Sequence, residues 1–255
     1  MNYKDFFSLK KKTIILIGGN GLIGKEVLKA LLDVGAKVVV IEKFNLKKNK
    51  KQNFYFERVD ISNLKNIENA FKKIFKKHGN PHGLINCSYP KTLDWTKNNY
   101  KNIKLNSFKK NIEIHLMSHI WIAKIVADKM KIKKRGSIVQ LGSIYGSLGQ
   151  DENLYFGTKI SESLTYPAIK GGIINSVRSM ASHYGKFNIR VNSISPGGVQ
   201  DDQNTKFIGR YIKRTPLKRM AKPKDIIGSS IFLLSDAAEY ISGIDLKVDG
   251  GWSCI

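Results

Sequence analysis

The chain has 255 residues, of which 42% are hydrophobic and 25% charged, as expected for one globular α/β domain and not for a disordered chain. Its net charge of +24 is spread over nearly every polar segment, which argues against nucleic-acid binding and favours attraction of a phosphate-bearing substrate. No apolar stretch reaches the about 20 residues that span a bilayer, and glycines interrupt the apolar run near the N-terminus, so we expect a cytoplasmic protein.

Strand and helix patterns alternate along the whole chain. Short β-branched or apolar runs predict strands at Thr13 to Ile17, Lys37 to Ile41, Phe54 to Val59, Gly83 to Asn86, Ser137 to Leu141, Ile189 to Ile194 and Ile244 to Val248. Apolar residues at helical spacing predict helices at Lys25 to Val34, Ile67 to Lys77, Asn106 to Lys131, Ala168 to Tyr184 and Asp225 to Leu234. This alternation predicts a doubly wound parallel sheet with helices on both faces, in a single domain over residues 1–255.

Three stretches are less regular, namely Ser88 to Leu105, Tyr145 to Thr165 and Gln200 to Ala221. Each follows a predicted strand, so we expect all three at the carboxyl edge of the sheet. In open α/β folds, ligands bind at that edge.

The first strand-to-helix turn reads I-G-G-N-G-L-I-G, with glycines three residues apart. Such a turn lets the backbone approach a pyrophosphate and points the N–H groups of the helix N-terminus at the anion. The pattern predicts a Rossmann-type dinucleotide site. Its candidate residues in this turn are Gly18, Asn20, Gly21, Leu22, Ile23 and Gly24.

The second predicted strand ends in Glu42, 24 residues after Gly18, where a carboxylate accepts hydrogen bonds from the ribose hydroxyls of adenosine. That carboxylate would repel the extra phosphate of NADP, so Glu42 favours NAD. The neighbouring Lys43 keeps NADP open as the alternative.

The segment Y-P-A-I-K-G-G-I-I-N-S-V-R-S-M-A-S-H-Y-G-K-F-N-I-R-V-N-S-I-S-P-G-G, from Tyr166 to Gly198, resembles the catalytic helix and following strand of short-chain dehydrogenases/reductases. The resemblance extends over almost the whole chain, through G-S-I-V-Q-L-G-S-I-Y-G and the closing Y-I-S-G-I-D-L-K-V-D-G-G-W. It implies a nicotinamide-dependent oxidoreductase. It also implies further cofactor contacts, at Asp60, Ile61, Asn86, Pro196, Gly197 and Val199.

Two Y-x-x-x-K pairs compete for the catalytic position that the resemblance implies. Tyr155 with Lys159 has the better spacing, 12 residues after Ser143, whereas Tyr166 follows Ser143 by 23. However, the distances from the tyrosine to the following helix and to the I-R-V-N strand match the family pattern only when they are counted from Tyr166. We therefore predict Tyr166 and Lys170 as the pair and interpret the preceding stretch as an insertion.

The predicted chemistry needs these residue types. A free phenol has a pKa near 10, and the ammonium of Lys170, four residues on and on the same helix face, would lower that pKa so that Tyr166 exchanges protons at neutral pH. Ser143 would hydrogen-bond the oxygen of the reacting carbonyl. The family usually adds a relay asparagine, but counting from Phe108 reaches His115. His115 is either a relay residue or a packing residue, and Asn111 is the alternative.

The segment 200–221 matches the substrate lid of the family, so the resemblance implies that its cations, Arg210, Lys213, Arg214 and Arg219, either bind a phosphate or carboxylate or lie on solvated faces. Trp95, Tyr145 and Tyr155 are candidates for aromatic walls around a ring-shaped substrate or for packing of the lid.

Within the family, the combination of S-I-Y-G, the insertion and Y-P-A-I-K-G-G-I-I-N resembles the subgroup linked to flagellin glycosylation and legionaminic-type sugars. This implies hydride transfer to or from a secondary alcohol or ketone on a sugar or sugar phosphate. The alternatives are a 3-oxoacyl-thioester reductase and a dinucleotide-binding regulator without turnover.

The two long helices resemble the family's oligomer interface, so a homodimer or homotetramer is expected. Cys87 and Cys254 lack metal-ligand spacing, so no metal site is expected.

Overall fold

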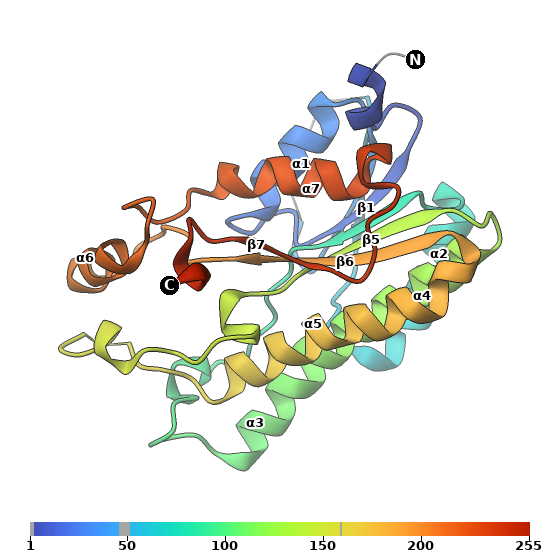
Figure 1. Ribbon diagram of the computed structural model, residues 1–255. Coiled ribbons are helices and arrows are strands. Elements are labelled where there is room, and N and C mark those ends of the chain that lie inside the picture. Colours follow the sequence, from blue (N-terminus) through green and yellow to red (C-terminus); the bar gives the residue numbers. More distant parts are fainter. Residues whose placement is uncertain (1–2, 46–51, 159) are drawn as a thin grey trace.

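The computed structural model describes residues 3–45, 52–158 and 160–255, and its described strands form one parallel sheet. The strands stand in the order β3-β2-β1-β4-β5-β6-β7 (Figure 1). Their bounds are β1 Thr13–Ile17, β2 Lys37–Glu42, β3 Phe54–Arg58, β4 Gly83–Asn86, β5 Gly136–Leu141, β6 Ile189–Pro196 and β7 Asp245–Val248. The order runs outward from β1 in both directions. The predicted Rossmann-type doubly wound sheet in a single domain is thereby confirmed.

The helices cover both faces of the sheet (Figure 1). Their bounds are α1 Gly24–Asp33, α2 Leu64–His78, α3 Leu105–Asn111, α4 Ser118–Lys131, α5 Thr165–Tyr184, α6 Thr205–Arg214 and α7 Ile227–Leu234. Helices α1 and α7 pack on one face, and α2, α4 and α5 pack on the other.

Each central strand contributes to two separate cores, because alternate side chains of a strand point to opposite faces. In β1, Ile15 and Ile17 pack against α2 and α4, whereas Ile14 and Leu16 pack against α1 and α7. All four are at most 2% exposed. This two-sided burial explains why the strands are apolar throughout, and it fixes the carboxyl ends of β1, β4, β5 and β6 along one edge.

Two segments differ from the sequence prediction. The helix expected over Asn106 to Lys131 is interrupted by a π-helical segment, Ile112–Met117, that joins α3 to α4. The stretch 200–221, expected to be irregular, contains α6, whose buried residues are Phe207 and Tyr211. The apolar stripe of α6 is narrow and set among lysines and arginines, so the sequence pattern did not reveal the helix.

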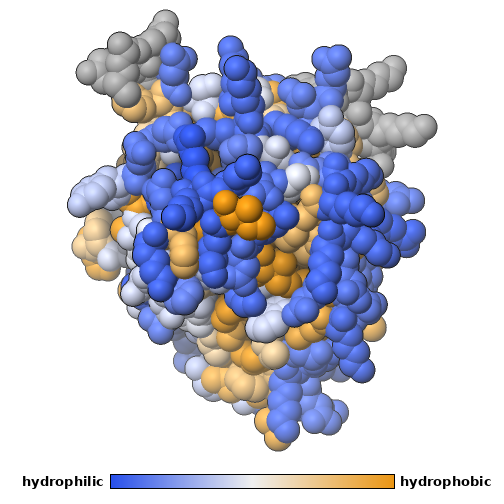
Figure 2. Space-filling view, turned by 90° about the vertical axis from the view of Figure 1, so that its right-hand side faces the viewer, coloured by the Kyte–Doolittle hydropathy of each residue, from blue (hydrophilic) through white to orange (hydrophobic). Residues whose placement is uncertain are grey.

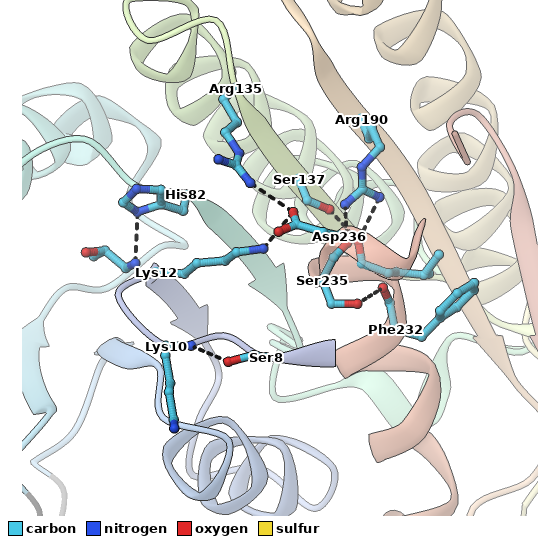
Figure 3. Close-up of polar contacts among 12 residues, drawn as sticks. Ser8, Lys10, Lys12, His82, Arg135, Ser137, Arg190, Phe232, Ser235 and Asp236 are labelled. Carbon is cyan, nitrogen blue, oxygen red and sulfur yellow. Dashed lines mark hydrogen bonds and ion pairs between the residues drawn. The ribbon is translucent and has the colours of Figure 1, made fainter. Parts of the chain in front are cut away.

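The amino edge of the sheet, opposite the expected site, is closed by polar contacts around Asp236 (Figure 3). Its Oδ1 lies 2.8 Å from Lys12 Nζ and 3.0 Å from Arg135 Nη2. Arg190 donates hydrogen bonds to the backbone oxygens of Leu233 and Ser235, just where α7 ends.

Viewed from this side, the upper part of the surface is mostly hydrophilic and hydrophobic residues gather lower down (Figure 2). None of the described helices has the length and apolarity needed to cross a bilayer.

Candidate active site

The turn between β1 and α1 is closed too tightly for side chains at two of its glycines. Gly18 has φ +80°, a conformation that favours glycine, and a methyl group there would lie 2.6 Å from the backbone nitrogen of Ser88. A methyl group at Gly24 would lie 1.9 Å from the carbonyl oxygen of Gly18. These glycines therefore let α1 begin directly above the end of β1.

This turn fits a pyrophosphate. Helix α1 has no side-chain cap at Ile23, and the N–H groups of Leu22 and Ile23 have no acceptor among the described residues. Asn20 and Gly21 are exposed beside them. Free N–H groups at a helix N-terminus are the donors that bind a phosphate, so the residues expected to hold the dinucleotide have the chemistry that this group requires.

The carboxylate of Glu42 is oriented by the same turn. Its Oε1 accepts a hydrogen bond of 2.8 Å from the backbone N–H of Asn20. Lys43, the neighbour that left NADP open, has its Nζ 2.9 Å from Asp60 Oδ2, and Asp60 also accepts hydrogen bonds from Ser62. The carboxylate at the end of β2 is therefore held toward the glycine turn, and the adjacent ammonium is turned to a different partner.

The other expected cofactor contacts lie at the ends of three more strands. Asn86, at the end of β4, is fully buried and its Oδ1 accepts hydrogen bonds from the N–H and hydroxyl of Ser88. Ile61 is buried below Asp60. Pro196 ends β6, and the backbone N–H of Val199 beyond Gly197 has no acceptor among the described residues. That N–H has the chemistry to donate to a carboxamide oxygen.

Ser143, Tyr166 and Lys170 converge at the carboxyl edge. Ser143 lies two residues beyond β5 and is 5% exposed. Burial raises the pKa of the Tyr166 phenol and a hydrogen bond with the Ser143 side chain opposes that rise, so the lowering of this pKa expected from Lys170 is not found in the cofactor-free protein. Lys170, one turn along α5, is 3% exposed, and its Nζ lies 5.8 Å from the centre of the Tyr166 ring. Burial lowers the pKa of Lys170 to about 7.

The competing tyrosine, Tyr155, has different partners. Tyr155 packs its ring 5.6 Å from that of Phe207 on α6 and accepts a hydrogen bond from Gln150. Its partner in the sequence pattern, Lys159, lies outside the described residues. Of the two tyrosines, Tyr166 is the one whose pKa is opposed in its rise by a hydrogen bond with the Ser143 side chain, whereas Tyr155 interacts with Tyr145 and Gln150.

His115 lies in the π-helical segment, fully buried behind this group. Its ring is 5.1 Å from that of Tyr89 and 5.0 Å from that of His119, and neither ring nitrogen has a hydrogen-bond partner among the described residues. Burial, with help from the charge of Lys170, lowers its pKa well below the usual value, so the ring is neutral. Asn111, the alternative, uses its side chain on Thr92 and Ser107 and is not available to Lys170.

Tyr89, the second residue beyond the L-I-N-C motif, was not predicted from the sequence as a site residue. Its ring lies 5.9 Å from Tyr166, 5.6 Å from Trp95 and 5.8 Å from Lys170 Nζ. Trp95 in turn lies 6.4 Å from Tyr166. Tyr89 and Trp95 form an aromatic wall beside the phenol. The position of Tyr89 just past the carboxyl end of β4 was the one signal that could have identified it.

The arginines expected to bind a substrate anion have protein partners instead. Arg214 Nη1 lies 2.7 Å from Asp151 Oδ2, and Arg210 donates to the backbone oxygens of Leu154 and Phe156. Arg219 pairs with Asp225. Of that set, Lys213 alone keeps a side chain with no partner among the described residues. The contacts of Arg210 and Arg214 tie α6 to the insertion that precedes α5.

The strand order, the glycine turn and the Ser143 group agree with the comparisons with known proteins. The profile of a family described as enoyl-(acyl carrier protein) reductase matches residues 20–253. The chain belongs to the short-chain dehydrogenase/reductase family. It is an oxidoreductase that uses a nicotinamide cofactor, NAD or NADP.

Three relatives span nearly the whole of this short-chain dehydrogenase. The post-translational flagellin modification protein A of Campylobacter coli is 31% identical over 96% of this chain and 99% of its own. D-arabinitol 2-dehydrogenase (ribulose-forming) of Candida tropicalis is 29% identical over 99% of this chain and 96% of its own. A crystal structure of a short-chain dehydrogenase from Leptospira borgpetersenii with bound NAD+ superposes with a TM-score of 0.89, at 30% identity, covering 99% of this chain and 97% of that one.

Proposed function

We propose that this protein transfers hydride reversibly between NAD(H) and a secondary alcohol or ketone on a sugar or sugar phosphate, in the synthesis of a surface glycan. The observation that carries the proposal is the convergence of the Ser143 hydroxyl, the Tyr166 phenol and the Lys170 ammonium at the carboxyl edge of the sheet. These are the donor and acid/base groups that reduction of a carbonyl requires.

In the reducing direction, Tyr166 gives its phenolic proton to the carbonyl oxygen, while Ser143 donates a hydrogen bond to the same oxygen. A nicotinamide bound by this site would supply or accept the hydride. Lys170 then stabilises the phenolate that remains, since a positive charge near a phenol favours its ionised form. Ketone, hydride and proton together give the alcohol, and the reverse sequence oxidises it.

His115 takes the place of the family's relay asparagine in this proposal. A neutral imidazole with unpartnered nitrogens, close to Tyr89 and influenced by the charge of Lys170, has the chemistry to hold a water molecule. After turnover, Lys170 passes a proton to the Tyr166 phenolate and takes one back from that water. His115→Asn should then keep most of the turnover, whereas His115→Leu should lower it and shift its pH profile. Equal turnover and equal pH profiles in the two variants would assign His115 to packing alone.

NAD is the proposed physiological cofactor. Glu42 is held toward the glycine turn and the Lys43 ammonium is paired with Asp60, so a carboxylate faces the expected position of the adenosine ribose. The backbone N–H groups of Leu22, Ile23 and Val199 would bind the pyrophosphate and the carboxamide.

A sugar-like substrate is supported by the site and by the relatives. The aromatic wall of Tyr89 and Trp95 suits the flat apolar face of a sugar ring. The named activities of two relatives concern flagellin modification and a polyol. In this proposal the segment 200–221 is the substrate lid. Because Arg210 and Arg214 are engaged with the insertion, Lys213 and the overall positive field attract a substrate phosphate.

A homo-oligomer in the cytoplasm completes the proposal. On the outer face of the long helix, Met117 is 49% exposed and Trp121 is 42% exposed, one turn apart. Large apolar side chains adjacent on a surface helix favour association with a second copy. Light scattering of the pure protein, compared with Trp121→Lys, tests this. A monomeric wild type would overturn it.

The function is tested by following NADH oxidation or formation with a panel of ketosugars, polyols and their phosphates. Turnover of a sugar or polyol with NAD(H) is the expected result. Turnover of a 3-oxoacyl thioester without any sugar would favour the alternative reductase. Saturable quenching or enhancement of NADH fluorescence with no turnover of any substrate would favour a dinucleotide-binding regulator.

A further inference from the structure

A buried polar cluster joins the loop after β4 to the first turn of α5. At its centre is Asn98, which is 1% exposed. Its side-chain Nδ2 donates to the backbone oxygen of Asp94 at 3.2 Å and to Ser107 Oγ at 2.9 Å. Its Oδ1 accepts a hydrogen bond of 2.7 Å from Thr165 Oγ1. Every polar group of this side chain is therefore used, and one of them holds the residue that precedes Tyr166.

The backbone of Asn98 makes two more contacts with the same turn. Its carbonyl oxygen accepts hydrogen bonds of 3.1 Å from the N–H of Leu164 and of 3.1 Å from the hydroxyl of Ser163. Ser163 Oγ in turn accepts the N–H of Tyr166 at 3.2 Å. Three consecutive residues before Tyr166 are thus anchored to one residue that lies 67 positions away from Thr165 in the chain.

The insertion makes this anchor necessary. Tyr166 follows Ser143 by 23 residues, so the connection between them is too long to fix the start of α5 by itself. The side chain of Leu164, which precedes α5, makes no capping hydrogen bond, and the Ser163 hydroxyl that accepts the Tyr166 N–H is itself held by the Asn98 carbonyl oxygen. The hydrogen bonds from Asn98 supply what the connection lacks, because they hold the first turn of α5 against the loop after β4.

The same loop carries the aromatic wall. Asp94, which binds the Asn98 amide through its backbone, also accepts hydrogen bonds from Thr92 and Ser107 through its side chain and directly precedes Trp95. The same buried cluster therefore positions Trp95, through Asp94, and Tyr166, through Thr165. A shift of Asn98 would move the phenol and the wall relative to each other.

We propose that Asn98, through Thr165, is a positioning residue that sets the Tyr166 phenol against Ser143 and the aromatic wall in a chain whose insertion has lengthened the usual connection. This role rests on the function proposed above. It assigns to Asn98 no contact with substrate or cofactor.

The test compares Thr165→Val with Thr165→Ser. Valine has the shape of threonine without the hydroxyl, whereas serine keeps the hydroxyl that binds Asn98. We expect Thr165→Val to lower kcat by about 10–100-fold, since small misplacements of a reacting group have effects of that size, with NADH affinity within about 2-fold. Thr165→Ser should restore kcat to within about 3-fold of wild type. Ser230→Ala is the control, because it removes a buried hydroxyl bond on α7, away from the site.

Hydrogen exchange of the Leu164 and Tyr166 amides is the second measurement, and it does not depend on turnover. We expect faster exchange in Thr165→Val and in Asn98→Ala, and wild-type exchange in Thr165→Ser. Wild-type kcat and exchange in Thr165→Val would overturn the proposal, and so would equal losses in the valine and serine variants. If the wild type turns over no substrate, the proposed function fails and the exchange rates alone decide the role of Asn98.

Discussion

Lys170 Nζ donates a hydrogen bond of 2.8 Å to the carbonyl oxygen of Leu141. Leu141 is the last residue of β5, and Ser143 follows it by two positions. The end of one buried strand therefore fixes both the ammonium and the hydroxyl, while α5 carries the phenol between them. The sheet therefore positions Lys170 and Ser143, whereas the loop after β4 contacts the residues that precede Tyr166.

Removing the Tyr166 hydroxyl should abolish proton transfer and leave the cofactor site unchanged. We expect Tyr166→Phe to lower kcat by at least about 1,000-fold, with NADH affinity within a few-fold, because the ring and its packing remain. Steady-state rates and NADH fluorescence titration measure the two effects. Tyr155→Phe is the matched control and should stay active, since Tyr155 packs against Phe207. Inactivation by Tyr155→Phe with an active Tyr166→Phe would refute the assignment.

The buried ammonium of Lys170 should destabilise the cofactor-free protein at low pH. Its pKa in the folded protein is about 7, below the ordinary 10.5. Burial of this ammonium therefore lowers the free energy of unfolding by its full amount below about pH 7, where Lys170 is protonated in both the folded and the unfolded protein. The loss becomes smaller as the pH rises toward the pKa of Lys170 in the unfolded chain. We expect Lys170→Met to raise the free energy of unfolding by on the order of 2 kcal/mol near pH 6, and by less near pH 9.

Urea unfolding without cofactor at several pH values measures this difference. Lys213→Met, at an exposed lysine of α6, is the control and should show no such pH dependence. A gain for Lys170→Met that stays constant or grows with pH would contradict the prediction. The same variant should be inactive, which would make Lys170 a site where function is maintained at the expense of stability.

Neutralising Glu42 should shift cofactor preference toward NADP. Glu42→Gln keeps an oxygen for the Asn20 N–H but removes the charge, and the basic side chains of Lys43 and Arg58 lie close by. We expect the ratio of kcat/KM for NADP to that for NAD to rise by about 10–100-fold. Lys43→Gln should lower the same ratio. An unchanged ratio in Glu42→Gln would mean that Glu42 does not face the ribose.

Asp236→Asn should weaken the amino edge without affecting turnover. Burial tends to raise the pKa of Asp236, but Lys12 and Arg135 outweigh it and lower that pKa. Its stabilising contribution is therefore present above the unfolded pKa and is lost as pH falls through the folded value. Because the side chain is 40% exposed, we expect a loss of at most about 1 kcal/mol at neutral pH.

Thermal or urea unfolding measures that loss, which should vanish in strongly acidic solution, where the wild-type carboxylate is also protonated. Arg135→Gln should show a similar loss of stability. A large drop in kcat for Asp236→Asn would contradict the assignment of this cluster to folding alone, since its partners Lys12 and Arg135 directly precede β1 and β5, at the edge opposite the site.

The features that depend only on short stretches of the chain could be predicted from the sequence alone. The strands and helices, the glycine turn, and the spacing of Tyr166 and Lys170 each depend on residues at most a few turns apart, and Glu42 follows Gly18 by one helix and one strand. Their geometry follows from local steric rules and from the alternation of apolar residues. For that reason the doubly wound fold and the dinucleotide turn could be stated before any coordinates were known, whereas the nicotinamide chemistry was implied by the resemblance to short-chain dehydrogenases/reductases.

Tertiary structure decided whatever depends on partners distant in the chain. Arg214 meets Asp151 across 63 positions, and Thr165 meets Asn98 across 67, so no local pattern reveals that an expected anion-binding arginine is engaged or that a loop anchors α5. The same holds for the approach of Tyr89 to Tyr166 and for Tyr155 packing on α6. Periodicity fixes which face a side chain occupies, whereas only the packed fold determines what lies opposite it.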